Sequence, residues 1–346
     1  MRALRLSLLV LITALMPVAT RAAAAIELRV LTDRTASHLE NIFKYYEQAH
    51  GVKIHTNYVG DGMLARLERR PLEADLVVTK NAALLELAKQ RGLLAMFSSQ
   101  QVIDNVPAVF RDPGWFYTVL SFRARALFYA RERVSVKQLG SYRDLATPAW
   151  KGRVCVRSGF HEYNMSLLSQ MAVSEGVEQT RAFIEGLRDN LARPPKGNDR
   201  AQVRALLEGE CDVAIANSYY MGIMLQREDQ KAWAEASRVF FPDQAGRGAY
   251  VMRSGAALTR AKRNVKHANQ LLAFLTGEFA QRYFSEALFE YPVKQGVAPA
   301  PINASLGEEQ GIVGGAYKIN LVSLKEAVAQ RGKVNELLTQ ANFDRR

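Results

Sequence analysis

The chain has 346 residues, a formal net charge of +12 at pH 7 and only two cysteines. Two cysteines exclude a structural zinc site built from four thiolates, and the length suits two lobes better than a single hydrophobic core. The basic residues are spread along the chain and not clustered. The simplest interpretation of the positive charge is therefore a solvated basic surface. The more specific alternative is a local set of arginines that binds an anionic ligand.

Residues 1–24 have the pattern of a secretory signal peptide. A basic start with Arg2 and Arg5 is followed by a short apolar stretch and then by small residues that offer a cleavage site after Ala24. Elsewhere, the sequence has no uninterrupted run of about 18 apolar residues, the length that a spanning helix needs. We therefore expect a soluble mature chain exported to the periplasm, for which nucleic acid is not an expected partner.

The first part of the mature chain alternates strands and helices. Apolar runs predict strands at 26–31, 52–59 and 74–79, and amphipathic spacing predicts helices at 37–50, 62–70 and 81–92. Such alternation is typical of a parallel sheet with helices on both faces.

A second alternating series begins after residue 152. It predicts strands at 153–158 and 211–217 and helices at 164–175, 178–191 and 199–210. Between the two series, alternating apolar residues at 115–132 predict a strand that crosses between the lobes. The remainder predicts a strand or loop at 249–258, helices at 264–277 and 278–288, an extended turn at 289–297 and a helical section at 319–343. The pattern predicts two doubly wound α/β lobes.

The two cysteines, Cys155 and Cys211, lie in strand-like runs. In an oxidising compartment an even pair can be bridged, provided that the two strands are neighbours and the Cα atoms lie within about 7 Å. The alternative is a pair of small buried hydrophobic residues, and the sequence leaves both open.

The sequence carries none of the strong enzyme motifs. G-x-S-x-G, the P-loop, a strand-linked G-x-G-x-x-G and H-E-x-x-H are all missing from it. An exported hydrolase or redox enzyme would need a nucleophile–base pair or a persistent cofactor. We therefore expect a binding protein and not an enzyme.

Three tyrosines follow the predicted strands of the second series. Tyr219 and Tyr220 stand side by side after the strand at 211–217, and Tyr163 follows the strand at 153–158. Ligands of doubly wound sheets bind outside the carboxyl ends of the strands, so these phenols can converge. Phenolate is a hard, anionic donor that suits a highly charged ion such as ferric iron. The alternative for each tyrosine is an amphipathic ring at a lobe surface.

Four longer stretches together resemble one known family. They are "ATPAWKGRVCVRSGFHEYNMSLL", "ARPPKGNDRAQVRALLEGECDVAIANSYYMG", "FEYPVKQGV" and "LSFRARALFYARE". They are similar to segments of the periplasmic ferric-iron-binding proteins of ABC importers, of the bacterial transferrin type, and the resemblance covers nearly all of the mature chain.

The resemblance implies a type II periplasmic binding protein, in which a two-strand hinge joins two α/β lobes. It implies a monomer that captures Fe³⁺ as its transported ligand and delivers it to an ABC permease of the inner membrane. Tyr163, Tyr219 and Tyr220 fall on positions that carry the family's metal-binding phenolates. The implied lobes are residues 26–124 with 250–300, and residues 125–249 with 301–346.

One segment departs from the family pattern. Many members have a Ser-x-Arg-His-Tyr-like segment after the first strand, whose His and Tyr add ligands from the other lobe. Here Thr35 and Ala36 take those places, while Arg34 is retained. Three phenolates leave open positions on a six-coordinate ferric ion, which carbonate, citrate or water can fill. The forked guanidinium of Arg34 suits a bidentate anion, with Arg125 as a second clamp; the alternative for each arginine is an ion pair at the surface or hinge.

A second function is open within the same fold. The basic residues at strand ends, Arg34, Arg123, Arg125 and Arg157, would suit an anion such as a phosphonate, and polyamines and thiamine are further solutes of this type. Colour separates these alternatives, because charge transfer from tyrosinate to iron gives a visible band that the others lack.

Overall fold

The computed structural model describes residues 26–261 and 263–345. The predicted signal peptide, residues 1–24, lies outside the described residues. Within them, none of the helices has the length and apolar character needed to cross a bilayer.

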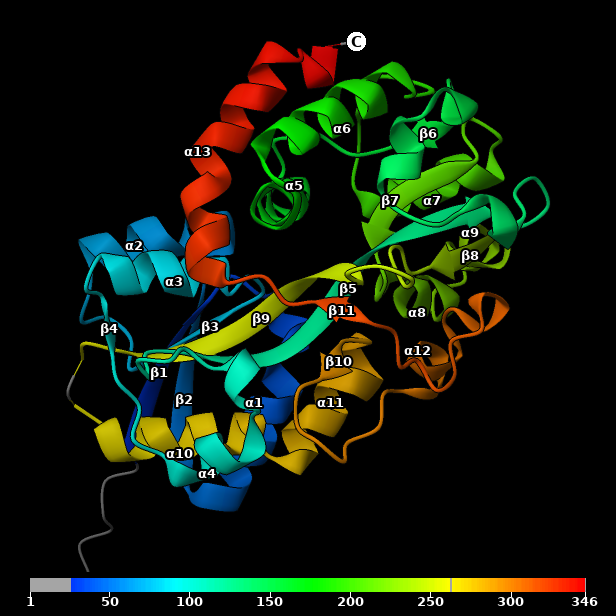
Figure 1. Cartoon of the computed structure of the whole chain (residues 1–346). Coiled ribbons are helices and arrows are strands. Elements are labelled where there is room, and N and C mark those ends of the chain that lie inside the picture. The colour runs from blue at the N-terminus through cyan, green and yellow to red at the C-terminus, as the bar shows by residue number, and fades with distance from the viewer. Residues whose placement is uncertain (1–25, 262, 346) are drawn as a thin grey trace, which may run out of the picture.

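The first lobe is built on three parallel strands (Figure 1). β1 (Ile26–Thr32) lies between β2 (Val52–Tyr58) and β3 (Leu76–Thr79). The buried residues of these strands pack with apolar helix faces into two clusters, one on each face of the sheet. The helices of this lobe are α1 (Glu40–His50), α2 (Met63–Arg69), α3 (Ala83–Gln90), α4 (Gln100–Asn105), α10 (Val265–Thr276) and α11 (Glu278–Leu288).

The second lobe repeats this plan with shorter strands (Figure 1). β6 (Val154–Cys155) pairs in parallel with β7 (Val213–Asn217), and β8 (Ser237–Phe240) lies nearby. Its helices are α5 (Glu162–Glu175), α6 (Val177–Asp189), α7 (Asp199–Leu207), α8 (Tyr220–Leu225) and α9 (Lys231–Glu235).

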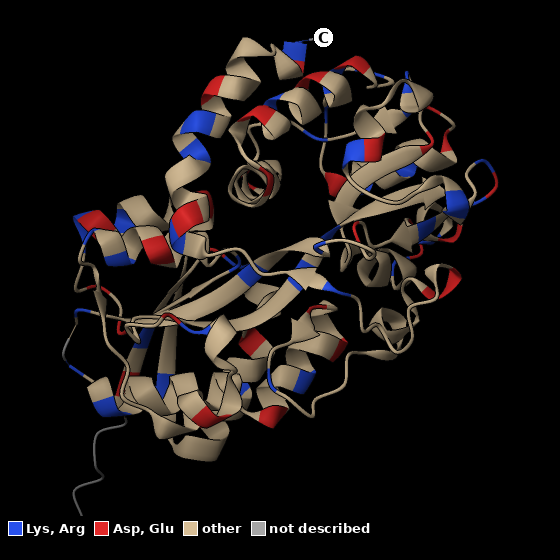
Figure 2. Cartoon of the chain, in the orientation of Figure 1, with Lys and Arg blue, Asp and Glu red and all other residues tan. Residues whose placement is uncertain are grey.

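Two long antiparallel strands run through both lobes, β5 (Thr118–Ala130) and β9 (Ala249–Thr259). β9 pairs with β3 of the first lobe, and β5 pairs with β7 and β8 of the second. The backbone hydrogen bonds therefore continue from one lobe to the other. These central strands carry basic residues (Figure 2). Their other residues are mostly apolar and buried. The predicted architecture of two α/β lobes with a two-strand hinge is confirmed.

Short elements complete the sheet edges and the connections. β4 (Leu94–Ala95) and β11 (Ile319–Asn320) pair with β9, and β10 (Tyr291–Pro292) pairs with β5. α12 (Pro301–Ser305) lies against α8.

The C-terminal helix α13 (Leu324–Gln340) packs against helices of both lobes. Most of its buried side chains join the core of the second lobe beside α5 and α6, while Leu324 packs against a cluster of the first lobe. In Figure 1 the helix extends from α3 to α6 along one side of the molecule. The assignment of residues 301–346 to the second lobe stays a prediction, and α13 is placed to contact both lobes.

The strand predicted at 153–158 is shorter in the structure. Only Val154 and Cys155 form β6. The side-chain amide of Asn164 donates to the carbonyl oxygens of Arg157 and Ser158, at 3.0 and 3.2 Å. These carbonyls are therefore satisfied by a side chain, and the chain turns into α5 at Glu162, two residues earlier than predicted.

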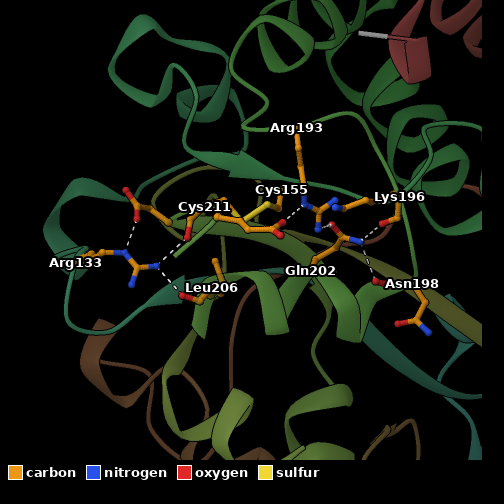
Figure 3. The surroundings of a disulfide bond; sticks show 10 residues. Arg133, Cys155, Arg193, Lys196, Asn198, Gln202, Leu206 and Cys211 are labelled. Atoms are coloured by element: carbon orange, nitrogen blue, oxygen red, sulfur yellow. Dashed lines mark hydrogen bonds and ion pairs between the residues drawn. A yellow bond between two sulfur atoms is a disulfide. The ribbon is translucent and has the colours of Figure 1, made fainter. Parts of the chain in front are cut away.

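Cys155 and Cys211 form a disulfide with their Cα atoms 5.9 Å apart. This settles the alternative that the sequence left open in favour of a bridge. The guanidinium of Arg133 supports the same region by donating to the carbonyl oxygens of Leu206 and Cys211, at 2.7 and 2.9 Å (Figure 3). The bridge ties the end of β6 to the start of the β7 run.

Candidate functional site

A cleft of about 670 Å³ lies where the two lobes face each other. The first lobe contributes the segment after β1 and part of α11, and the second lobe contributes the start of α5 and the segment around α8. The polar side chains that line the cleft are Asp33, Arg34, Thr35, Ser37, His38, Asn41, Lys80, Arg123, Tyr163, Arg200, Tyr219, Tyr220, Gln226, Arg227, Tyr283 and Glu290.

All three predicted tyrosines line this cleft, and each is held at the start of a helix. Tyr163 is the second residue of α5, and its N–H donates to Nδ1 of His161, the residue that caps this helix, at 3.1 Å. Tyr219 directly precedes α8, and Tyr220 is its first residue. Burial lowers the pKa of His161 to about 4, with help from Arg157, so the imidazole stays neutral and can accept this hydrogen bond.

The three phenols are close enough to influence one another. The rings of Tyr219 and Tyr220 lie 4.2 Å apart between centroids. Burial raises the pKa of Tyr219 well above its ordinary value, and its neighbours Tyr163 and Tyr220 raise it further. Burial and Tyr163 also raise the pKa of Tyr220. Without a cation, these two phenols are therefore protonated at neutral pH, and a bound cation would have to displace their protons.

Arg123 lines the cleft and approaches two of the three tyrosines. Its guanidinium carbon lies 5.9 Å from the ring centroids of both Tyr163 and Tyr219. One nitrogen, Nη2, donates to the carbonyl oxygen of Lys80 at 2.6 Å, and Nη1 is 3.8 Å from a carboxylate oxygen of Glu290. Nε and Nη1 are buried and have no hydrogen-bond partner. These donors are suited to an anion placed beside the tyrosines.

Arg34 lies in the cleft as predicted and is held by an acidic partner. Its Nη2 donates to Glu290 at 2.8 Å, while its Nε is buried without a partner. Burial alone would raise the pKa of Glu290, but the attraction of Arg34 and Arg123 outweighs it and lowers that pKa to about 2. Glu290 is therefore a carboxylate that both arginines share.

Arg125 is placed away from the cleft. Its side chain is fully buried, and Nη1 donates to Asp199 at 2.6 Å and to Asn217 at 3.0 Å, while Nη2 donates to Asn164 at 2.8 Å. Its guanidinium carbon approaches the Tyr163 ring at 5.7 Å. Arg123 and Arg125 point to the same face of β5, but two residues of strand carry Arg125 beneath the second lobe. The structure therefore does not bring Arg125 to the cleft with Arg34, and its role as an anion clamp has no support here.

Several cleft residues were not singled out from the sequence. Lys80, Arg200 and Arg227 add positive charge to the cleft, and His38 adds an imidazole from the first lobe. Burial lowers the pKa of His38 to about 4, and the positive charge of Arg34 lowers it further. The signal in the sequence was weak, because these residues belong to four separate segments. Their common position follows only from the packing of the lobes.

The departure from the family pattern is visible in the structure. Thr35, which takes the place of the histidine in the family pattern, lines the cleft, and its hydroxyl lies 3.3 Å from that of Ser37. Among the described residues, no group of three or more His, Cys, Asp or Glu side chains is arranged to hold a metal ion. Tyr250 and Tyr291 are engaged elsewhere, by Glu175 and the carbonyl of Asn303.

Comparison with known proteins gives a consistent picture. The family model for bacterial extracellular solute-binding proteins matches residues 73–310. Iron uptake protein A1 of Synechocystis sp. is 33% identical over 332 residues, which cover 94% of this chain and 90% of that protein.

The solved structures that resemble this chain cover nearly all of it. Apo ferric ion-binding protein A of Pasteurella haemolytica matches with a TM-score of 0.84 and 36% identity, covering 92% of this chain and 99% of that one. A Trichodesmium protein in complex with iron and citrate matches with a TM-score of 0.84 and 28% identity, with the same coverage. The expected resemblance to ferric-binding proteins is confirmed, and the matched family is one of solute-binding proteins and not of enzymes. The chain belongs to the bacterial extracellular solute-binding protein family.

Proposed function

We propose that this protein captures ferric iron in the interlobe cleft, with Tyr163, Tyr219 and Tyr220 as phenolate ligands. The observation that carries the proposal is the gathering of three phenols from two neighbouring segments of one lobe in a cleft that the other lobe faces. The names of similar proteins, which refer to iron uptake and ferric binding, support it.

The chemistry of the donors favours a trivalent cation. The raised pKa values of Tyr219 and Tyr220 mean that a weakly charged ion would not remove their protons at neutral pH. A ferric ion stabilises the phenolate form through its high charge and its preference for hard anionic oxygen. Three phenolates would cancel the charge of Fe³⁺ and still leave coordination positions open.

An anion such as carbonate or citrate would complete the iron shell between the lobes. Arg34 and Arg123 both line the cleft and have buried guanidinium nitrogens without hydrogen-bond partners, and such donors suit a bidentate carboxylate. Citrate is present with iron in the similar Trichodesmium structure. Arg123 thus takes the place in this proposal that the sequence suggested for Arg125.

The remaining parts of the proposal concern transport. The signal peptide pattern at 1–24 directs the chain to the periplasm, and an ABC permease of the inner membrane receives the iron. We propose that the protein acts as a monomer, since one chain supplies both lobes of the cleft and no second copy is needed to form it. A ligand that touches both lobes favours their closed arrangement through its extra affinity for that arrangement.

The test is a ferric titration of the iron-stripped mature protein, followed by visible absorbance with and without bicarbonate or citrate. We expect a one-to-one charge-transfer band in the wild type and its loss or strong reduction in Tyr219→Phe and Tyr220→Phe. Tyr45→Phe is a matched control, because Tyr45 is an exposed phenol of α1 outside the cleft.

The proposal fails if no visible band forms with any of these anions. A band that survives in both cleft variants would place the iron elsewhere. With no band, phosphonates and polyamines become the solutes to screen.

A further inference from the structure

Arg253 of β9 is a buried arginine without an acidic partner. Its side chain is 94% buried, since the residue exposes only 6% of its surface. Nη2 donates to the carbonyl oxygen of Val322 at 2.6 Å, and Nε is buried with no hydrogen-bond partner. Burial lowers the pKa of Arg253 to about 10, a value at which the guanidinium still carries its charge at neutral pH.

Three other deeply buried arginines each lie next to a carboxylate, which two of them share. Arg34 and Arg123 face Glu290, and Arg125 faces Asp199. A buried charge that lacks a counter-ion is strongly destabilising, whereas a well-paired one recovers much of the cost of leaving water. Within residues 26–261 and 263–345, Arg253 makes no ion pair, and its recorded neighbours are the carbonyl of Val322 and the phenol of Tyr117. Arg253 is therefore a buried cation of the hinge whose charge no carboxylate of the described residues offsets.

Arg253 lines a cavity of about 540 Å³. The cavity lies between β5, β9, the 108–113 loop and the 321–325 connection that leads into α13. In the β5–β9 pairing, Arg253 stands opposite Phe122, while Arg123 stands opposite Met252. Directly opposed residues of an antiparallel pair point to the same face. Arg253 and Arg123 therefore leave opposite faces of the hinge, and this cavity is separate from the iron cleft.

Positive charge predominates in this hinge cavity. Lys89, Arg111 and Lys325 line it together with Arg253, against two acidic residues, Glu86 and Asp112. Both acidic residues are already engaged. Glu86 accepts from the hydroxyl of Tyr117 at 2.9 Å and from Gln90 at 3.0 Å.

Asp112 pairs with Lys89 at 2.5 Å and accepts from the N–H of Phe116 at 3.1 Å. Neither carboxylate is hydrogen-bonded to Arg253. The buried Arg253, the exposed Lys325 and Arg111, whose Nε donates to the carbonyl oxygen of Val106, are thus the cations of the cavity that no carboxylate of the described residues engages.

We propose that the hinge cavity is a second binding site, which takes a small oxyanion of carboxylate or phosphate chemistry on Arg253. The guanidinium and the ammonium of Lys325 would meet such an ion together. The ligand would touch β9 and the connection to α13, so it would add contacts to the hinge without entering the iron cleft. The proposal does not depend on iron binding.

The test is isothermal titration of the apo mature protein with inorganic phosphate and, separately, with malonate. The cleft arginines can also bind these anions, so the titrations are repeated in the Arg34→Gln variant. We expect binding that persists in Arg34→Gln, weakens at least tenfold in Arg253→Gln and weakens a few fold in Lys325→Gln. The preferred anion of the two identifies the carboxylate or phosphate class. Lys333→Gln is the matched control, because Lys333 is another exposed lysine of α13 and does not line the cavity.

Thermal unfolding separates this role from a purely structural one. Without added anion, Arg253→Gln should melt at the same temperature as the wild type or higher, because the variant removes an unmatched buried charge. With phosphate or malonate, the wild type should gain stability and Arg253→Gln should not.

Absence of binding by both anions overturns the proposal. So does binding that Arg34→Gln abolishes while Arg253→Gln and Lys325→Gln leave it unchanged, since that pattern would place the anions in the cleft. If Arg253→Gln does not fold, the anion affinities of Lys325→Gln and Lys333→Gln test the proposal instead. Equal affinities in these two variants would reject the site.

Discussion

The guanidinium of Arg125 and the carboxylate of Asp199 meet at 2.6 Å with both side chains fully removed from solvent. Asp199 is also bound by the N–H of Asn217, at 2.9 Å, and by Arg157, at 3.3 Å. Asn217 ends the strand that leads to Tyr219 and Tyr220. The pair therefore lies under the tyrosine cluster and fixes the ends of the elements that carry it.

We predict that Asp199→Ala lowers the free energy of unfolding by about 3–5 kcal/mol, because it leaves Arg125 buried and uncompensated. Chemical denaturation measures this loss. The double variant Arg125→Met with Asp199→Leu should recover part of this loss, because it removes both charges of the pair and leaves only Arg157 without its contact to Asp199. A loss below about 1 kcal/mol in Asp199→Ala would contradict the supporting role of the pair.

Arg123 should contribute to the anion-dependent part of ferric binding. We predict that Arg123→Gln weakens ferric binding about tenfold in the presence of bicarbonate or citrate, because Arg123 carries unpaired donors beside the tyrosines. The same variant should reduce the difference between titrations with and without the anion. Visible titration measures both. Arg204→Gln, at an exposed position of α7, is the control; an unchanged anion effect in Arg123→Gln would remove Arg123 from the site.

Glu162 connects the two lobes beside a proposed ligand. It accepts from the side chain of Asn81 in the first lobe at 2.5 Å and from two nitrogens of Arg331 in α13, both at 2.7 Å. Tyr163 is the next residue. We predict that Glu162→Gln speeds iron release to a competing chelator about tenfold, since hydrogen bonds to a charged group are worth roughly 1.5–3 kcal/mol.

Stopped-flow absorbance at the charge-transfer band measures this release. Glu178→Gln is a matched control, because it breaks an exposed pair with Arg181 on α6. Equal release rates in the two variants would show that the contact between the lobes does not hold the iron.

The stability of the apo protein should fall in acid partly through Glu290. The positive charges around it lower its pKa from 4.5 to about 2, despite the opposing effect of burial. A carboxylate whose folded pKa is depressed stabilises the fold above its unfolded pKa, and this stabilisation is lost as pH falls from about 4.5 toward 2. The shift corresponds to about 3 kcal/mol.

We therefore predict that Glu290→Gln is much less stable than the wild type at pH 7 and that the difference shrinks as pH falls below 4.5. Denaturant unfolding across this pH range measures it. A difference that stays constant with pH would mean that the charge of Glu290 contributes nothing.

The disulfide should contribute strongly to stability. It links residues 56 positions apart, and closing a loop of this size is worth roughly 2–5 kcal/mol. We predict that the double variant Cys155→Ala with Cys211→Ala loses stability in this range while keeping the iron band, because neither cysteine lines the cleft. Denaturation in the presence and absence of a reductant checks the assignment. The reductant should lower the free energy of unfolding of the wild type and leave that of the double variant unchanged.

The sequence predicted the local elements well where one physical signal was enough. Amphipathic spacing located α1, α6 and α7 to within a few residues, and the apolar alternation at 115–132 gave the crossing strand β5. The strand at 153–158 was overextended, because its apolar pattern does not reveal that Asn164 satisfies the following carbonyls.

The candidate ligands were also within reach of the sequence. Tyr163, Tyr219 and Tyr220 follow directly after strands, and the carboxyl ends of strands are where an α/β lobe collects its functional side chains. Because neighbouring parallel strands end at the same edge of the sheet, the tyrosines that follow them lie close together.

The choice among the arginines depended on tertiary structure. Arg123 and Arg125 occupy equivalent places in an alternating strand, and no sequence pattern favours the first. The packing of the lobes distinguishes the two arginines. Asp199 of α7 forms an ion pair with Arg125, whereas Arg123 lies beside Tyr219. By itself, then, the sequence determined the helices, the strands and the phenols at their ends, since these follow from short-range periodicity. Which charges are paired, and which remain free for a ligand, was decided only when segments distant in the chain came into contact.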